Sequence, residues 1–176
     1  MSALLKIFVG DGRGFAKLNR ALIVLIPKRT DADTVADFRP ISMPHSISKL
    51  FAKLLATRLR PRMQDIVTFN QSAFIKGRSL HDNFLLVRQV ARKISARKSK
   101  GVFLKLDISR AFDSLSWPFL FEVLKAKGFG DRWISWIIIL LQSTSTRIVI
   151  NGDQGRRINH AQGLRQGDPV SPLLFV

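Results

Sequence analysis

Residues 101–107, GVFLKLD, constrain the fold more than any other segment, because an apolar run ends there in a carboxylate. Five of the first six positions lack a polar side chain, and such a run predicts a buried strand over residues 102–107. An aspartate at the end of a buried strand lies at the rim of a sheet, where ligands and metal ions bind in many α/β proteins. Asp107 is therefore a candidate ligand for Mg²⁺, and the alternative is a residue that caps the following turn or helix.

The rest of the chain predicts a mixed α and β fold. Residues 21–28, ALIVLIPK, are apolar and β-branched, which favours a buried strand. Apolar residues spaced by three or four predict helices over residues 47–60, 80–94, 116–127 and 131–142. The pair Asn151-Gly152 indicates a hairpin turn, and the segment SPLLF is expected to begin a last helix.

Several ends and faces of these helices follow from the sequence. Ser46 is the expected N-cap of the first helix and Pro61 its stop, whereas Ser116, Gly128 and Asp131 bound the later helices. The first helix is expected to bury Ile47, Leu50, Phe51, Leu54, Leu55 and Leu59. The second has an apolar face of Leu80, Phe84, Val87, Ala91 and Ile94, opposite a basic side that includes Arg88 and Arg92.

Charge indicates a polyanionic partner, because 29 Lys and Arg face only 12 Asp and Glu, giving a formal net charge of +17. The longest strongly apolar run, residues 133–141, is far below the roughly 20 residues that a membrane span needs. Those residues are expected to join the core rather than to form a base-stacking platform. The absence of cysteine excludes disulfides and thiolate metal sites and fits an intracellular location.

The acidic residues bear on metal chemistry, because two-metal catalysis requires several carboxylates close together. Nowhere in the sequence are two acidic residues adjacent, so Asp107 supplies only part of such a site. Asp131 and Asp168 are better placed as helix caps. The three histidines, at positions 45, 81 and 160, lack the spacing of metal ligands.

The segment GLRQGDPVSPLLFV, residues 163–176, is a second candidate site. Gly163 and Gly167 allow close approach of the backbone, and Arg165 and Gln166 offer hydrogen-bond donors to a phosphate or nucleotide edge. The alternative is a loop that only changes the chain's direction. Arginines in FRPIS and KGRS are candidate phosphate contacts, although a single such arginine is more often solvated.

Seven segments, taken together and in order, resemble the reverse transcriptase of non-LTR (LINE-type) retrotransposons, particularly those abundant in plant genomes. They are LIPK (25–28), DFRPIS (37–42), SKLFAKLLATRL (48–59), NQSAFIKGRSLHDN (70–83), KLDISRAFDSLSW (105–117), NGDQG (151–155) and GLRQGDPVSPLLF (163–175).

This resemblance implies an α+β fold: a partial right-hand polymerase with fingers and an incomplete palm, and without a thumb. The fingers would span about residues 21–100 and the palm about residues 101–176, and residues 1–20 stay unassigned. The implied partners are an RNA template, a DNA primer and a dNTP, with Mg²⁺ as the metal and no membrane.

The resemblance also assigns roles to single residues. Asp107 matches the first catalytic aspartate, and Ile108 would offer its backbone carbonyl to a metal. Phe112 matches the bulky residue that disfavours a ribose 2′-hydroxyl. Nucleotide contacts are expected from Gln166, Gly167, Lys28 and Arg39. Nucleic-acid contacts are expected from Gln71, Gly77 and Arg78, which match a template-binding segment, and from the basic residues Arg88 and Arg92.

The sequence departs from the family at one motif. The family's second metal-binding motif contains Asp-Asp, and no Asp-Asp pair occurs in these 176 residues. We therefore expect a polymerase fragment that is catalytically inactive as an isolated chain. Two alternatives stay open: a non-catalytic fragment that binds RNA or DNA, and a decayed remnant without a role.

Overall fold

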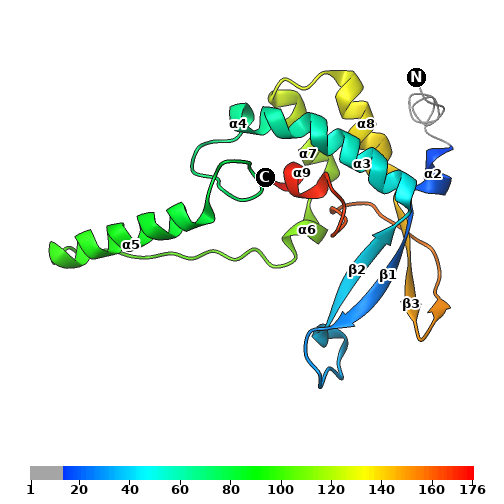
Figure 1. Ribbon diagram of the computed structural model, residues 1–176, viewed down its shortest axis with the longest axis horizontal. Coiled ribbons are helices and arrows are strands. Elements are labelled where there is room, and N and C mark those ends of the chain that lie inside the picture. Colours follow the sequence, from blue (N-terminus) through cyan, green and yellow to red (C-terminus); the bar gives the residue numbers. More distant parts are fainter. Residues whose placement is uncertain (1–13) are drawn as a thin grey trace.

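The computed structural model describes residues 14–176, and it confirms the mixed α and β fold. A group of helices lies at one end of a small sheet, and one long helix projects away from both (Figure 1). The helices are α2 (Phe15–Leu18), α3 (Ser46–Leu59), α4 (Met63–Ile66), α5 (Leu80–Ala96), α6 (Ala111–Ser114), α7 (Trp117–Ala126), α8 (Asp131–Gln142) and α9 (Ser171–Phe175), with short 3-10 turns at η1 (Val35–Asp37) and η2 (Arg60–Arg62). The strands are β1 (Arg20–Pro27), β2 (Phe38–Pro44), β3 (Ser145–Ile150), β4 (Asp153–Gln154) and β5 (Ile158–Asn159).

The sheet is built around β1, which forms as predicted. The expectation that this strand is buried is wrong for most of it, because within β1 only Ala21 is buried and Ile26 is 48% exposed. Strand β1 pairs antiparallel with β2, from Ala21 opposite Pro44 to Pro27 opposite Phe38. On its other side it pairs parallel with β3, in the order β2-β1-β3-β4, and β5 also pairs with β3. The predicted hairpin is confirmed, because Asn151 and Gly152 both have positive φ angles, 51° and 91°, between β3 and β4.

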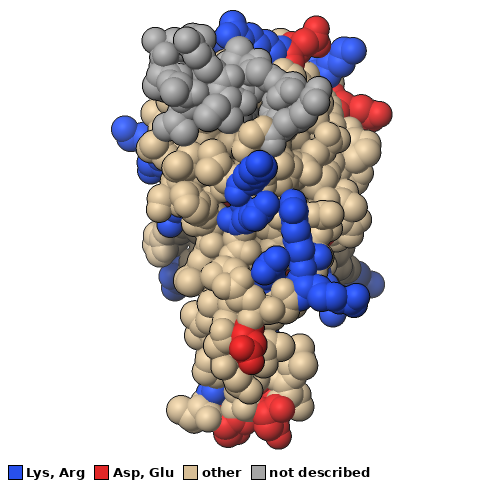
Figure 2. Space-filling view, turned by 90° about the vertical axis from the view of Figure 1, so that its right-hand side faces the viewer, with Lys and Arg blue, Asp and Glu red and all other residues tan. Residues whose placement is uncertain are grey.

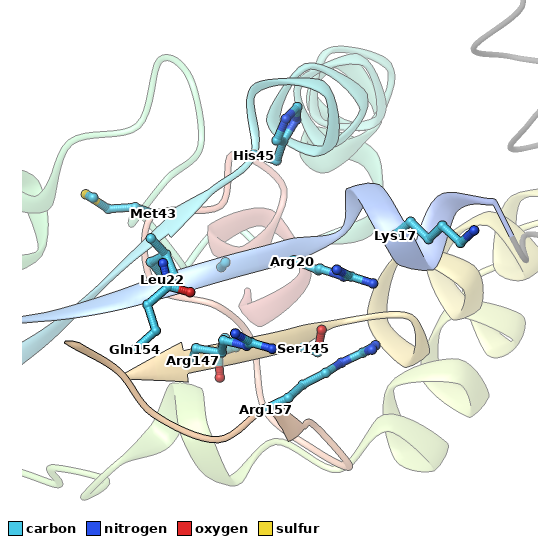
Figure 3. A pocket seen from close by; sticks show the side chains of 11 residues that line it. Lys17, Arg20, Leu22, Met43, His45, Ser145, Arg147, Gln154 and Arg157 are labelled. Carbon is cyan, nitrogen blue, oxygen red and sulfur yellow. The ribbon is translucent and has the colours of Figure 1, made fainter. Parts of the chain in front are cut away.

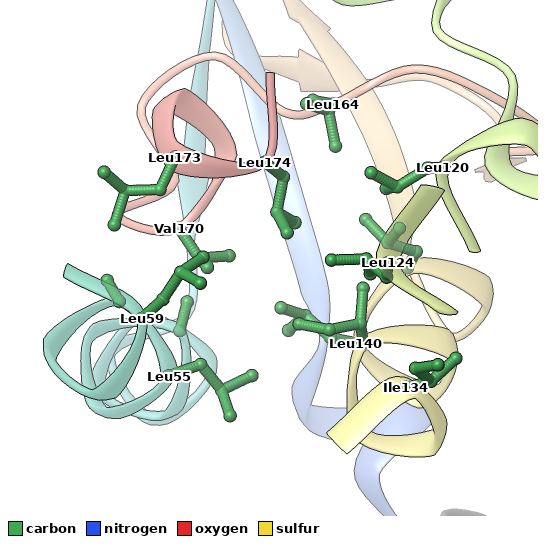
Figure 4. Close-up of a cluster of buried hydrophobic side chains, with 14 of the residues drawn as sticks. Leu55, Leu59, Leu120, Leu124, Ile134, Leu140, Leu164, Val170, Leu173 and Leu174 are labelled. Atoms are coloured by element: carbon green, nitrogen blue, oxygen red, sulfur yellow. The ribbon is translucent and has the colours of Figure 1, made fainter. Parts of the chain in front are cut away.

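The hydrophobic core lies between the helices rather than over the whole sheet (Figure 4). Its most buried side chains come from α3, α8 and the segment before α9: Leu55, Leu59, Ile137, Leu140 and Val170. Leucines of α7 and α9 close the cluster from the other side. The prediction that residues 133–141 belong to the core is confirmed, since α8 buries Ile134, Ile137, Leu140 and Leu141.

The predicted buried face of α3 is wrong in part. Leu50 is 62% exposed and Leu54 is also exposed, whereas Ala52 and Ala56 are fully buried. Small side chains let neighbouring segments approach the helix closely, so the buried face is rotated toward Ser48, Ala52, Leu55, Ala56 and Leu59.

Two predicted helix caps are displaced by one residue. His45, not Ser46, precedes α3, and its Nδ1 accepts a hydrogen bond of 3.4 Å from the backbone N–H of Ile47. Gly130, not Asp131, precedes α8, and Asp131 occupies the first helical position. A carboxylate there still meets the positive end of the helix dipole.

The predicted strand at residues 102–107 is wrong. Residues 101–108 carry no regular structure and are exposed, with Val102 97% exposed. A strand needs a neighbouring strand to receive its backbone hydrogen bonds, and within residues 14–176 none pairs with this segment.

The helix α5 forms as predicted, but its apolar face is not buried by the described residues. Phe84 is 62% exposed and Leu86 is 60% exposed, and none of the helix's residues is classed as buried. None of the described helices combines the length and the apolar composition that a membrane crossing requires.

The location of the core predicts unequal costs for the same substitution in two helices. Leu140→Ala removes a side chain that is 1% exposed, so we expect it to lower the free energy of unfolding by about 2–5 kcal/mol. Leu86→Ala on α5 is the matched control and should change it by no more than about 0.5 kcal/mol. Urea unfolding followed by circular dichroism measures both. Equal losses would contradict the described position of the core.

Candidate functional site

The loop of residues 163–168, GLRQGD, is fastened by hydrogen bonds to the segment that contains α6 and the start of α7. The backbone N–H of Gly163 donates to Leu115 O (2.8 Å), and that of Leu164 donates to Phe112 O (2.7 Å). The indole Nε1 of Trp117 donates to Gly163 O (2.7 Å) in a buried bond. These bonds fix the loop beside the segment that follows Asp107.

Both glycines of the loop are required by its geometry. Gly163 has a φ of +78°, and a Cβ there would lie 2.6 Å from Asp113 O. Gly167 has a φ of +93°, and a Cβ there would lie 3.5 Å from Ser42 O. Gly163 therefore makes the expected close approach to the protein's own backbone, whereas at Gly167 the positive φ alone favours glycine, since 3.5 Å is an ordinary contact.

A cluster of buried polar side chains holds the same loop against the start of β1 and the end of α8. The side chain of Arg165 is 5% exposed, donates through Nη2 to Asn19 Oδ1 and lies 3.5 Å from Asp168 Oδ2. Asn19 Nδ2 donates to Leu140 O (2.6 Å) and Ser143 Oγ (2.8 Å) at the end of α8. The cluster thus joins the start of β1, the end of α8 and the loop.

Asp168 also links this cluster to α9, because its Oδ1 accepts a hydrogen bond of 3.0 Å from Val170 N at the start of that helix. Asp168 is not itself the N-cap predicted from the sequence, because Val170 occupies that position, but its carboxylate holds the residue that does. Burial raises the pKa of Asp168, and the nearby Arg165 guanidinium opposes that rise. Burial also lowers the pKa of Arg165.

A pocket of about 330 Å³ lies between this loop and the sheet, and we call it the loop pocket. Gln166 lines it from the loop, and Ile23 and Ser42 line it from paired positions of β1 and β2. Arg165 Nη1 and Ser42 Oγ, both buried, have no hydrogen-bond partner among the described residues. Unpaired buried polar atoms beside an exposed glutamine make the pocket suitable for a polar ligand.

His160 lies on the wall of the loop pocket. Its Nε2 is 3.0 Å from Thr146 Oγ1. Burial lowers the pKa of His160, and the positive charge of Arg165 lowers it further. The ring therefore favours its neutral form, which both donates and accepts hydrogen bonds.

Asp107 and Ile108 lie outside the loop pocket, in the exposed segment that leads into α6. In residues 14–176 there is no group of three or more His, Cys, Asp or Glu side chains that could hold a metal ion. One carboxylate and one carbonyl do not complete the oxygen shell of Mg²⁺, so the described residues do not form a metal site.

Phe112 is held at the contact between α6 and α9. Its ring stacks on Phe175, with centroids 4.4 Å apart and an interplanar angle of 16°. Because the backbone of Phe112 also accepts the hydrogen bond from Leu164, the aromatic residue and the loop share one anchoring point.

Lys28 and Arg39 lie at the far end of the β1–β2 hairpin from the helices. Lys28 Nζ donates to Ala36 O (2.6 Å), which closes the hairpin loop. Arg39 is exposed on β2. Since side chains alternate along a strand, Arg39 faces away from the side that carries Pro40 and Ser42, both of which line the loop pocket.

The segment with Gln71, Gly77 and Arg78 forms a separate loop that Arg78 organises. The Arg78 guanidinium donates to the backbone carbonyls of Thr68, of Gln71 (2.7 Å) and of Val67 (3.0 Å). Gly77 has a φ of +82°. Arg88 and Arg92 are exposed on α5. The structure therefore does not gather all expected nucleic-acid contacts at one place.

Sequence reasoning missed Asn19, although this fully buried side chain connects α8 to Arg165. Asn19 follows the hard-to-interpret opening segment and lies in no periodic pattern. Its contacts come from residues more than 120 positions away in the chain, so no local signal identifies it.

Comparison with known proteins identifies a family whose sequences match this chain. Residues 26–176 match the family described as reverse transcriptase (RNA-dependent DNA polymerase). The chain is 32% identical over 153 residues to the Retrovirus-related Pol polyprotein from type-1 retrotransposable element R2 of Nasonia vitripennis, covering 86% of this chain and 15% of that protein.

Two further relatives cover similar parts of the chain. It is 32% identical over 155 residues to the Pol polyprotein from type-2 retrotransposable element R2DM of Drosophila melanogaster, covering 88% of this chain and 14% of that protein. It is 28% identical over 156 residues to the Transposon TX1 uncharacterized 149 kDa protein of Xenopus laevis, covering 89% and 12%. The chain thus spans only a small part of the length of these relatives.

The contact between Gly163 and Asp113 predicts that a methyl group at position 163 lowers the free energy of unfolding. The loss should exceed that at Gly128, a glycine of similar φ without close neighbours. Gly128→Ala, at φ +80° with no atom within 4 Å of its new Cβ, should cost about 1–2 kcal/mol. Gly163→Ala should cost about 1–3 kcal/mol more, because its Cβ meets backbone. Urea unfolding compares the two variants, and equal stabilities would show that the close approach is absent.

Proposed function

Because the chain belongs to the reverse transcriptase (RNA-dependent DNA polymerase) family, within its non-LTR retrotransposon members, we propose that it works as part of a polymerase domain that copies RNA into DNA. One observation carries this proposal. The loop with Gln166 is hydrogen-bonded to the segment with Phe112, so two motifs 54 positions apart in the chain stand side by side.

In this proposal the loop pocket receives part of the incoming dNTP or of the template base paired with it. Gln166 and Gly167 line the nucleotide, and Phe112 meets its sugar. The unpaired donor Arg165 Nη1 supports a polar occupant of the pocket. Fastening the loop by three hydrogen bonds supports this role, because a fixed donor loses little entropy on binding.

The remaining contacts are assigned to nucleic acid and triphosphate. Lys28, at the end of the β1–β2 hairpin, approaches the triphosphate or the template. Arg39 faces away from the loop pocket, so of these two partners we assign it to the template. The template lies along the loop that contains Gln71, Gly77 and Arg78. The Arg78 guanidinium holds this loop in shape, and the protein backbone of the loop contacts the template strand. The basic side of α5, with Arg88 and Arg92, binds phosphates.

We assign residues 21–100 to the fingers and residues 101–176 to part of the palm, and residues 1–20 to neither. The β1–β2 hairpin and α5 then belong to the fingers, whereas the loop pocket lies where the two parts meet. The family supports an RNA template, a DNA primer and dNTPs as substrates. It favours this role over that of a non-catalytic binding fragment.

Polymerases of this family depend on a metal, and we propose Mg²⁺, with the Asp107 carboxylate and the Ile108 carbonyl as two of its oxygen ligands. When bound, the ion would stabilise the charge on the transferred phosphoryl group. Residues 14–176 hold no group of three or more His, Cys, Asp or Glu side chains that could hold a metal ion, so Asp107 and Ile108 supply only part of the site that we propose.

The isolated chain is therefore expected to incorporate no dNTP on an RNA template with a DNA primer in Mg²⁺. A primer-extension assay measures this, with an active retroviral reverse transcriptase on the same template–primer as the positive control. Asp107→Asn should behave like the unsubstituted chain. Extension by the chain that Asp107→Asn abolishes would show instead that these residues complete a working metal site.

A further inference from the structure

A second pocket, of about 480 Å³, lies on the sheet between β1 and β3 and is lined by four cationic side chains. These are Lys17, Arg20, Arg147 and Arg157, and we call the site the basic pocket (Figure 3). No Asp or Glu among the described residues lines the basic pocket. None of the four cations was expected to be functional from the sequence.

The strand register explains why these cations meet. β1 and β3 run parallel, with Arg20 opposite Ser145 and Leu22 opposite Arg147. Arg20 and Arg147 therefore point to the same face of the sheet as diagonal neighbours on adjacent strands. Figure 3 shows the charged ends of Arg20 and Arg157 extending in the same direction, and Lys17 reaches the pocket from α2.

The basic pocket and the loop pocket lie on opposite faces of the sheet. Ile23 and Ser42 face the loop pocket, whereas Leu22 and Met43, one residue away along each strand, line the basic pocket. A ligand of the basic pocket is thus separated from Gln166 by the thickness of the sheet.

The charges in the basic pocket are uncompensated by the described part of the chain. None of the four cationic side chains has an ion pair or hydrogen bond to a described residue. Figure 2 shows Lys and Arg gathered in the middle of the molecular face that carries β3, with one acidic residue below that group and the others toward the bottom and the upper right of the view. Like charges held close together repel one another, and an anion relieves that repulsion.

A buried hydroxyl points to the same ligand class. Ser145 lines the basic pocket and is 1% exposed, yet its Oγ has no hydrogen-bond partner among residues 14–176. A buried donor without a partner is costly to keep, and a phosphate oxygen would accept its hydrogen bond.

We propose that the basic pocket binds the phosphate backbone of a nucleic acid. Arginine forks match phosphate oxygens, and neither Phe nor Trp lines the pocket in the described structure to stack on a base. The site therefore holds a strand without reading its sequence. It goes beyond the proposed polymerase function, because it lies on the other face of the sheet and needs neither a dNTP nor a metal.

The test compares two double variants that remove the same charge. Arg20→Gln with Arg147→Gln changes two exposed residues of the basic pocket, and Lys53→Gln with Lys125→Gln changes two exposed residues of α3 and α7. Fluorescence anisotropy measures the affinity for a labelled oligouridylate across a salt series. The pocket variant should bind about tenfold more weakly at low salt, and its slope of log affinity against log salt should be smaller by about 1.4.

The lysine variant should keep the slope of the unsubstituted chain. Equal changes in both variants would show that only net charge matters, and an unchanged arginine variant would also overturn the proposal. A loss confined to phosphatidylserine vesicles, with oligouridylate binding intact, would assign the pocket to a membrane surface instead. Circular dichroism confirms that each variant is folded. Because no dNTP is added, the outcome is independent of whether the chain takes part in polymerisation.

Discussion

The buried hydrogen bond from Trp117 Nε1 to Gly163 O, with the two backbone bonds beside it, is the contact on which the rest of the structure depends. It joins the loop of residues 163–168 to the start of α7, and Arg165 continues the connection to Asn19 and α8. Breaking one partner would leave polar groups unpaired in the interior, which costs more than the net value of a hydrogen bond. The helical core and the sheet are thereby held in one arrangement, with the loop pocket between the loop and the sheet.

This arrangement would let a strongly basic chain serve the two anionic ligands that we propose. The loop pocket offers Gln166 and an unpaired guanidinium nitrogen on one face of the sheet. The basic pocket gathers Arg20 and Arg147 on the other face. Strand alternation separates the two sets, so the proposed nucleotide and the proposed phosphate backbone would lie on opposite sides of the same short sheet. Net charge alone, by contrast, indicates only that the partner is a polyanion.

Local signals in the sequence predicted local structure well. The Asn151-Gly152 turn, the apolar strand before Lys28 and the helices all formed as expected, because each depends on residues near in the chain. The strand ending at Asp107 did not form, because a strand depends on a distant partner and the described residues supply none. Similarly, Gly163 and Gln166 were predicted as site residues, whereas Asn19 was not, since its hydrogen bonds join residues far apart in sequence. The position of Asp107 relative to other metal ligands depends on such non-local contacts too.

The most direct test of the central claim, that the loop of residues 163–168 presents Gln166 to an incoming nucleotide, is the dissociation rate of the chain from an RNA–DNA template–primer. The rate is measured with the next complementary dNTP and, separately, with a non-complementary one. The complementary dNTP should slow dissociation of the unsubstituted chain, and Gln166→Ala should remove the difference while leaving dissociation without dNTP unchanged. Equal rates with both nucleotides in the unsubstituted chain would contradict the claim.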